Sequence, residues 1–160
     1  MTGSTTKTLD LSAKRIKLDE IHLVVNLFDS YRVFYKQTSD LVLAENYLNE
    51  RLKNNESVIF VVLDNEKPIG FTQLYPTYSS VRMVRNWILN DLYVDGDCRK
   101  QGIGKILINA AMDFGRSAGA KYVQLETAVD NYSAQHLYES IGFVKQLPGT
   151  EFIMYRKTVD

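Results

Sequence analysis

The stretch NDLYVDGDCRKQGIGKILIN, residues 90–109, decides how the chain is organised. Its first part ends a strand-like run, its middle is a short polar loop, and its last part begins a helical pattern near Gly102. Backbone N–H groups in the first turn of a helix have no intrahelical acceptor, and the helix dipole is positive there. The stretch therefore predicts a site for an anionic group such as a phosphate. Three cationic side chains surround it: Arg99, Lys100 and Lys105.

Length and composition predict one globular domain. The chain has 160 residues, of which 45% are apolar and 24% are charged, values typical of a folded domain with a sizeable core. The first residues are small and polar, so we expect a flexible lead over residues 1–12 and a single domain over residues 13–160.

Charge and cysteine content exclude several classes. Lys plus Arg number 19 and Asp plus Glu number 19, and this balance argues against a nucleic-acid partner, which needs a basic face. The single cysteine, Cys98, excludes an internal disulfide and fits a reducing, cytoplasmic compartment. The apolar runs are too short for a membrane span, and the N-terminus lacks a signal-peptide core. We expect no metal site, because His22 and His136 are isolated.

Hydrophobic periodicity predicts a mixed α/β fold. Helices are expected over residues 20–36, 40–52, 102–117 and 131–140. Strands are expected over residues 13–18, 57–63, 68–75, 84–94, 121–126, 143–146 and 151–157, while residues 76–80 break the pattern as a loop or bulge. A strand–helix–strand unit in the second half of the chain predicts parallel pairing there.

Three kinds of phosphate-binding loop are candidates for the opening stretch. A Walker loop fails because Gly102 and Gly104 are too close together and Ile106 stands where a hydroxyl residue belongs. A dinucleotide fingerprint fails because Leu107 replaces its third glycine. The pyrophosphate loop of acyl-CoA-binding proteins, Arg/Gln-x-x-Gly-x-Gly/Ala, matches residues 99–104 at every specified position.

A second motif follows the loop. NYSAQHLYESIGF, residues 131–143, resembles an Asn-x-x-Ala-x-x-x-Tyr-x-x-x-Gly-Phe segment. The two motifs in this order, separated by a strand, resemble the GNAT superfamily of acyl-CoA-dependent N-acyltransferases. The resemblance covers residues 68–144 and implies a GNAT-like mixed, partly splayed β-sheet flanked by helices.

The resemblance implies acetyl-CoA as co-substrate. Glycines let the loop backbone approach the pyrophosphate closely. The amides of pantetheine would pair with an exposed strand edge as a pseudo-strand, and the sheet would splay at a bulge near residues 91–93. The cofactor-binding residues that the resemblance implies are Leu92, Tyr93, Val94, Arg99, Lys100, Gln101, Gly102, Ile103, Gly104, Lys105, Asn131 and Ala134.

Catalytic roles also follow from the resemblance. Tyr138 matches the family's general acid. The pKa of a phenol, about 10, is close to that of a thiol, so proton transfer from Tyr138 to the CoA thiolate is nearly balanced. The amide of Leu92 would polarise the thioester carbonyl. Asp91 is the candidate base or acceptor-amine ligand, with a plain hydrogen bond to a loop equally open. Glu126 is the alternative base.

The acceptor is predicted from aromatic residues, whose faces suit a cation or an apolar amine. The expected substrate-binding residues are Tyr31, Tyr35, Tyr75, Asn90 and Glu126. The segment around residues 87–95 looks most like the polyamine and histone-like lysine branch of the family.

Three functions remain open at this point. Direct acetyl transfer to a small amine or polyamine in a ternary complex is favoured over transfer to a protein lysine or N-terminus. A non-catalytic acyl-CoA-binding domain is the third. Family members often dimerise through the last strands, which here would place a homodimer edge near residues 152–155.

Overall fold

The computed structural model describes residues 11–146 and 153–159. The chain forms two compact units, Met1–Glu126 and Thr127–Asp160, called unit 1 and unit 2 below. The single domain expected over residues 13–160 stays a prediction. Of the expected N-terminal lead, only Leu11 and Ser12 are among the described residues.

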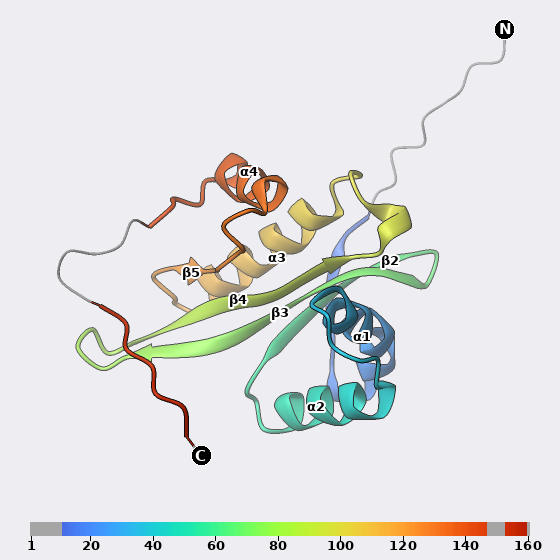
Figure 1. The fold of residues 1–160 in the computed structure, drawn as a ribbon, viewed down its shortest axis with the longest axis horizontal. Coiled ribbons are helices and arrows are strands. Elements are labelled where there is room, and N and C mark those ends of the chain that lie inside the picture. Colours follow the sequence, from blue (N-terminus) through green and yellow to red (C-terminus); the bar gives the residue numbers. More distant parts are fainter. Residues whose placement is uncertain (1–10, 147–152, 160) are drawn as a thin grey trace, which may run out of the picture. The chain divides into compact units, whose positions relative to one another are not determined.

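Unit 1 is built on a five-stranded sheet in the order β1-β2-β3-β4-β5 (Figure 1). The first four strands pair antiparallel, and β5 pairs parallel to β4, as the strand–helix–strand pattern predicts. The strands are β1 Ala13–Arg15, β2 Val58–Asp64, β3 Lys67–Ser79, β4 Val84–Val94 and β5 Val123–Gln124.

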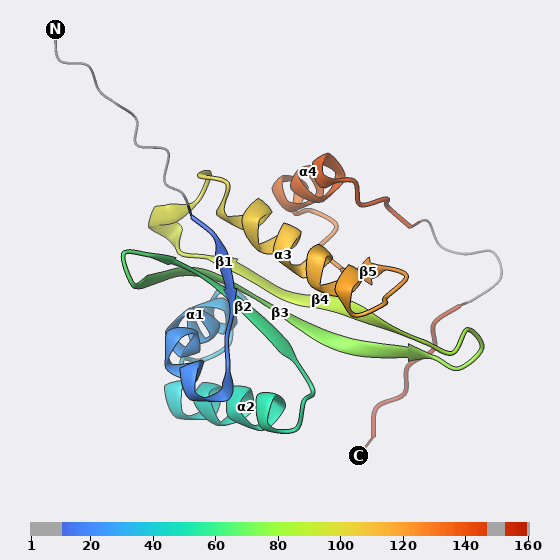
Figure 2. The ribbon, with the colours of Figure 1, turned by 180° about the vertical axis from the view of Figure 1, so that it is seen from behind.

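Helices cover both faces of this sheet. On one face lie a 3-10 helix η1 (Leu18–Leu23), α1 (Val25–Phe34) and α2 (Leu41–Lys53), and on the other lies α3 (Ile103–Ser117) (Figures 1 and 2). Neighbouring residues of a strand point to opposite faces. Accordingly the ring of Phe71 contacts Phe28 of α1, with ring centroids 6.1 Å apart, whereas a Cβ built on Gly70 would lie 3.0 Å from Ile103 of α3.

Buried apolar residues lie on both faces of the sheet: one cluster joins the sheet to η1, α1 and α2, and α3 buries Ile103, Leu107, Ile108 and Ala111 on the other face. Residues of β2 are buried in an unbroken apolar run from Val58 to Val62, as expected for a strand covered on both faces. A short 3-10 helix η2 (Gly96–Cys98) then joins β4 to α3. The fold class is therefore the predicted one, a mixed α/β sheet flanked by helices.

A β-bulge interrupts β4. Gln73 of β3 faces Asp91 and the next residue, Leu74, faces Leu89, so Asn90 is an extra residue without a partner in the register. β5 pairs with β4 only at Trp87 and Ile88. Among the described residues, the edge of β4 beyond the bulge therefore has no strand on its β5 side, which is the expected opening of the sheet.

Three expected elements differ in extent. The strand predicted to reach Leu18 ends at Arg15, and the first helix begins as η1 before α1 continues it. The break predicted over residues 76–80 is wrong, because β3 runs through Pro76, which faces Trp87. Past Leu74, β3 has no further pairing with β2, and proline is tolerated at such an edge position because its missing N–H breaks no second ladder.

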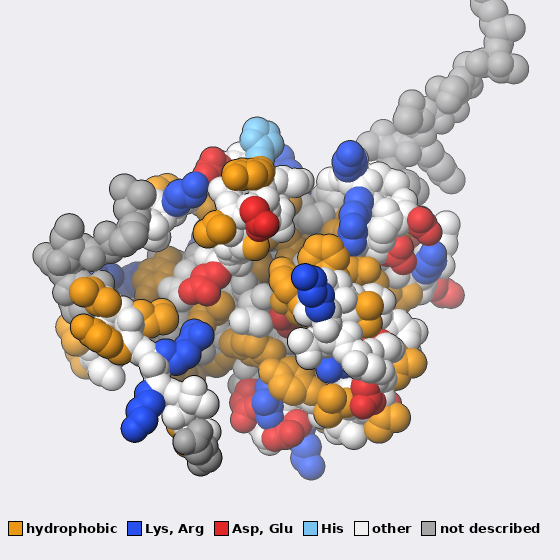
Figure 3. All heavy atoms as spheres, viewed as in Figure 1, with side chains coloured by type: hydrophobic (Ala, Val, Ile, Leu, Met, Phe, Trp, Pro, Cys, Tyr) orange, Lys and Arg blue, Asp and Glu red, His pale blue; other side chains and the backbone are white. Residues whose placement is uncertain are grey.

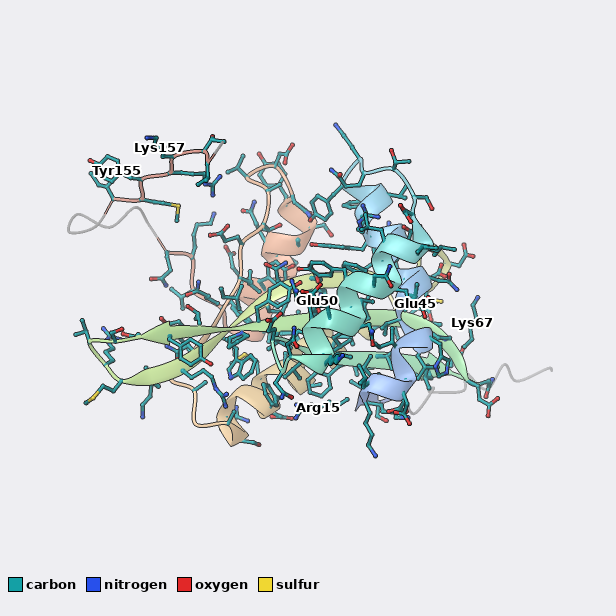
Figure 4. The ribbon with its side chains drawn as sticks, turned by 90° about the horizontal axis from the view of Figure 1, so that it is seen from below. Arg15, Glu45, Glu50, Lys67, Tyr155 and Lys157 are labelled. Carbon is teal, nitrogen blue, oxygen red and sulfur yellow. The ribbon has the colours of Figure 1, made fainter. Side chains whose placement is uncertain are left out.

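Unit 2 contains α4 (Tyr132–Ile141). Asn131 caps its start by accepting the N–H of Ala134 at 3.2 Å, and Gly142, with φ 106°, ends it. The strands predicted over residues 143–146 and 151–157 are not formed at residues 143–146 or 153–157, and residues 151 and 152 lie outside the described residues. A strand requires a partner, and none pairs with these described segments, one of which carries Tyr155 and Lys157 (Figure 4).

Candidate active site

A cavity of about 400 Å³ opens in unit 1 against α1, α2, β3 and β4. Aromatic rings form much of its wall, and two charged side chains, Arg32 and Asp91, also line it. The aromatic residues are Phe28, Tyr31, Tyr47 and Tyr75. This composition, a mostly apolar wall with few polar groups, is typical of a small-molecule site.

The bulge at Asn90 places Asp91 in this cavity. Trp87 faces α3, where its ring lies 4.8 Å from that of Phe114. In a regular strand, Asp91 would point to the same face as Trp87, because the two are four residues apart and side chains alternate. The extra residue reverses the alternation, so Asp91 lines the cavity on the α1 face instead.

Asp91 is held by amide donors. Asp91 is buried, with only 2% of its surface exposed. Gln73 Nε2 donates to Oδ2 at 2.5 Å and Asn90 Nδ2 donates to Oδ1 at 2.9 Å. Burial raises the pKa of Asp91, and hydrogen bonds from Gln73, Asn90 and Tyr31 oppose the shift. A carboxylate with a raised pKa is a better proton acceptor than an exposed one.

The tyrosine hydroxyls also have partners. Tyr31 Oη donates to the carbonyl oxygen of Asn90 at 3.3 Å, and the hydroxyls of Tyr47 and Tyr75 lie 2.9 Å apart. Burial, then the charge of Asp91, raises the pKa of Tyr75 far above its usual range. Tyr75 is therefore a neutral hydrogen-bonding group and not an anion.

The predicted phosphate loop has the geometry of a helix start. Lys100 and Gly102 both have positive φ, 61° and 80°, and α3 begins at Ile103, whose side chain is buried. A Cβ on Gly102 would meet nothing within 4 Å, so this position needs glycine for its left-handed backbone and not for space. The loop thereby presents the first-turn amides of α3, which have no intrahelical acceptor.

Side chains of the loop divide into two groups. Arg99 is tied down: Nε donates to the carbonyl oxygen of Val94 at 3.1 Å, and its guanidinium lies 5.6 Å from the ring centre of Tyr93 and 5.8 Å from that of Phe34. The side chains of Lys100, Gln101 and Lys105 are exposed. An anion at the start of α3 would therefore meet backbone amides first, with the exposed cations Lys100 and Lys105 near them in the chain.

Comparison with known proteins identifies the family. The model of the acetyltransferase (GNAT) family matches residues 21–143. The chain belongs to this family. It is an acyl-CoA-dependent N-acetyltransferase.

Relatives cover most of the chain. An uncharacterized N-acetyltransferase of Bacillus subtilis, YhfO, is 43% identical over 91% of this chain and 95% of its own length. A probable acetyltransferase of Haemophilus influenzae is 35% identical, covering 77% and 83%. The crystal structure of a probable acetyltransferase matches with a TM-score of 0.83 and 37% identity, over 92% of this chain and 97% of that one.

A structure solved with CoA shares the fold. An aminoglycoside N-acetyltransferase in complex with CoA superimposes with a TM-score of 0.76 at 18% identity, covering 92% and 94% of the two chains. At this identity the likeness shows the fold alone. Acetyl-CoA is the co-substrate of GNAT enzymes, and the loop of residues 99–105 is chemically suited to its pyrophosphate.

Several predicted site residues of this GNAT acetyltransferase meet in unit 1. Tyr31, Tyr75, Asn90 and Asp91 all line the cavity. Leu92, Tyr93 and Val94 follow the bulge and are half-buried along the open edge of β4. Ile103 is buried and Gly104 half-buried in the first turn of α3.

Two predicted residues lie elsewhere in unit 1. Tyr35 does not line the cavity; it is 52% exposed and packs edge-on against Tyr31 with ring centroids 5.0 Å apart. Glu126 is exposed, two residues after β5. Sequence reasoning missed Arg32, Tyr47 and Gln73, because helical and strand spacing mark the buried faces of elements but not which polar side chains meet across them.

The predicted residues of unit 2 lie on α4. Asn131 uses its side-chain oxygen to cap the helix, and Ala134 is half-buried in its first turn. Tyr138 is half-buried, its ring centre 6.1 Å from that of Phe143, and its carbonyl oxygen accepts the N–H of Phe143 at 3.0 Å. The cofactor roles of Asn131 and Ala134 and the acid role of Tyr138 stay predictions.

Within residues 11–146 and 153–159, no group of three or more His, Cys, Asp or Glu side chains is placed to hold a metal ion. No helix in the described part of the chain has the length and apolarity required to cross a membrane.

Proposed function

We propose that this enzyme transfers the acetyl group of acetyl-CoA directly to a primary amine of a small molecule that binds in the cavity around Asp91. The observation that carries the proposal is one buried carboxylate inside an aromatic-walled cavity. A carboxylate and aromatic faces attract an ammonium group, and the same carboxylate can take its proton. The cavity of about 400 Å³ is of small-molecule size.

The reaction in a ternary complex needs three events. The amine loses a proton to Asp91 and its nitrogen attacks the thioester carbonyl carbon. The carbonyl oxygen, negative in the transition state, accepts a hydrogen bond from the amide of Leu92. The C–S bond then breaks, the CoA thiolate takes a proton from Tyr138, and the extra proton on the amide nitrogen is released and restores the phenol of Tyr138. The roles of Leu92 and Tyr138 rest on the family motif.

Acetyl-CoA binding is assigned to the open side of the sheet. Amides at the start of α3 take the pyrophosphate, with Arg99, Lys100, Gln101 and Lys105 around it. The edge of β4 from Leu92 to Val94 pairs with pantetheine. The supporting observation is that β5 pairs with β4 only at Trp87 and Ile88.

A protein lysine or N-terminus is the second candidate acceptor. Large apolar side chains are exposed on α1 and α2, a surface that also shows orange in Figure 3, and such patches are typical of binding sites. They include Phe34, Tyr35, Leu41, Val42 and Leu43. A peptide on this surface would present its amine to the same cavity.

Thiol release from acetyl-CoA tests the acceptor. The purified protein is assayed with small amines, with polyamines and with lysine-containing and free-N-terminal peptides. We expect the highest kcat/KM with a small amine. Turnover of peptides alone would replace the proposal by the second candidate, and tight acetyl-CoA binding without turnover of any amine would favour an acyl-CoA-binding role.

Location and assembly are also proposals. A cytoplasmic enzyme fits the single, half-buried thiol of Cys98 and the use of acetyl-CoA. A homodimer is proposed from family habit; light scattering during size-exclusion chromatography measures it directly.

A further inference from the structure

The wall of the cavity carries one positive and one negative side chain. Arg32 and Asp91 are its two charged lining residues. Asp91 faces the proposed amine site, so Arg32 supplies a second, opposite charge in the same small volume. A substrate that carries a single positive charge would pair with Asp91 but would offer no negative group to Arg32.

Arg32 is weakly engaged by the protein. Its Nη1 lies 3.4 Å from Asp29 Oδ1 and 3.4 Å from the carbonyl oxygen of Thr38. Both distances exceed the usual 2.7–3.2 Å of an N–H···O hydrogen bond, and charge-assisted pairs are normally shorter still. The guanidinium has five N–H donors, and among the described residues its hydrogen bonds use Nη1 alone, which leaves donors for a ligand.

Asp29 does not depend on Arg32. Ser39 Oγ donates to Asp29 Oδ2 at 2.6 Å and the N–H of Asp40 donates to Oδ1 at 2.9 Å. These bonds, that of Ser39 first, hold the pKa of Asp29 below its usual value. The buried carboxylate is therefore stabilised mainly by Ser39 and Asp40, and its ion pair with Arg32 is the longer contact.

A second substrate cation would find no carboxylate there. The acidic residues of α2, Glu45 and Glu50, are exposed and do not line the cavity (Figure 4). The second ammonium group of a diamine or polyamine would instead approach the guanidinium of Arg32. Like charges in a partly buried site repel by several times more than in water.

We infer that the acceptor is a small amino carboxylate, whose amine binds at Asp91 and whose carboxylate binds the planar fork of Arg32. Two parallel N–H···O bonds match a carboxylate to a guanidinium. The inference rests on the proposed function, which it narrows, and it speaks against polyamines as the acceptor.

Three matched series of substrates test it: unbranched ω-amino carboxylates of increasing chain length, the alkylamines of equal length, and the corresponding diamines. We expect kcat/KM for the best amino carboxylate to exceed that of its alkylamine and diamine partners by about tenfold or more, one charge-assisted contact being sufficient. Amino sulfonates form a fourth arm, which separates recognition of negative charge from recognition of carboxylate geometry.

Arg32→Gln should remove the preference for amino carboxylates by raising their KM. For the best amino carboxylate KM rises about tenfold more than for the alkylamine, so the ratio of their kcat/KM values falls toward one. Arg32→Lys, which keeps the charge but loses the fork, should restore part of the preference. Arg116→Gln is the matched control, because Arg116 pairs with Asp113 at the same i,i+3 spacing, at 2.8 Å, in the last turn of α3 and away from the cavity.

The outcomes separate the two proposals. Turnover of alkylamines or diamines without an amino-carboxylate preference, or a preference that survives Arg32→Gln, overturns the inference and leaves small-amine acetylation standing. No turnover of any small amine overturns both. Acetyl-CoA affinity, measured by calorimetry on each variant, shows that the variants are folded.

Discussion

The loop of residues 99–105 and the cavity around Asp91 are built on opposite principles. The loop is one continuous stretch, and its shape depends on the left-handed backbone of Lys100 and Gly102, both at positive φ, a region that glycine adopts readily and lysine rarely. The cavity collects residues of α1, α2, β3 and β4. The anion binding predicted for the loop needs only the helix start, whereas the proposed acceptor site depends on register across the sheet.

The two regions differ in how far the effect of a single residue extends. In the loop, each glycine affects the backbone conformation at its own position. At the cavity, one extra residue in β4, Asn90, changes the face to which Asp91 points. The cavity is thus the more fragile of the two regions, and variants should separate effects on acceptor chemistry from effects on acetyl-CoA binding.

Asp91→Asn should have the largest effect on the cavity. Loss of the proton acceptor lowers kcat/KM by about 10³-fold and removes the acidic limb of the pH–rate profile, while acetyl-CoA affinity is kept. Asp113→Asn, an exposed carboxylate of α3, is the control. An unchanged acidic limb in the Asp91 variant would exclude Asp91 as the base.

Asp91→Asn should also affect the stability of the protein. The folded-state pKa of Asp91 is raised by burial, so its contribution to stability is complete below the unfolded pKa of about 3.9 and is lost as pH rises through the folded pKa. Asp91→Asn should therefore melt at an equal or higher temperature than the wild type at neutral pH. A lower melting temperature at neutral pH would contradict this sign.

Tyr138→Phe extends the comparison to unit 2. If the family motif assigns the general acid correctly, kcat falls by about 10²-fold and the dissociation constant of acetyl-CoA is unchanged. Tyr132→Phe, an exposed tyrosine of the same helix, should leave both constants near wild type. Full turnover in the Tyr138 variant would exclude that residue from proton transfer.

Gly104→Val should affect the loop alone. A bulky side chain in the first turn of α3 obstructs the pyrophosphate, so acetyl-CoA affinity falls about tenfold with little change in acceptor preference. Gly102→Ala is the informative partner, since its Cβ meets open space and its cost is backbone strain of about 1–2 kcal/mol. Unaltered affinity in Gly104→Val would mean that the loop does not hold the pyrophosphate.

Gln73→Met should have the smallest effect. It removes the donor that lowers the pKa of Asp91, so the acidic limb of the pH–rate profile moves to higher pH while the rate on the plateau is kept. Gln73 Oε1 is buried without a hydrogen-bond partner among the described residues, so its loss offsets the lost bond and stability changes by about 1 kcal/mol or less. Gln124→Met on β5 is the control, and a limb that stays in place would show that the bond does not tune Asp91.

Sequence reasoning succeeded where the information is local. The helix after the loop, the paired strands β2 and β3 and the capped α4 follow from periodicity, turn chemistry and caps. It failed at Pro76 and at residues 143–146, because whether a segment becomes a strand depends on a partner elsewhere in the chain.

The sequence by itself determined the family, most of the order of elements and the loop before α3 for which anion binding is predicted, since these depend on contiguous residues. Only the tertiary structure decided that Asp91 enters an aromatic cavity: the family resemblance predicted a bulge near residues 91–93, but the face to which Asp91 points depends on the register shift at Asn90. It likewise brought Gln73 and Arg32 into that site from β3 and α1. Pairing between distant segments sets the chemistry of the acceptor site.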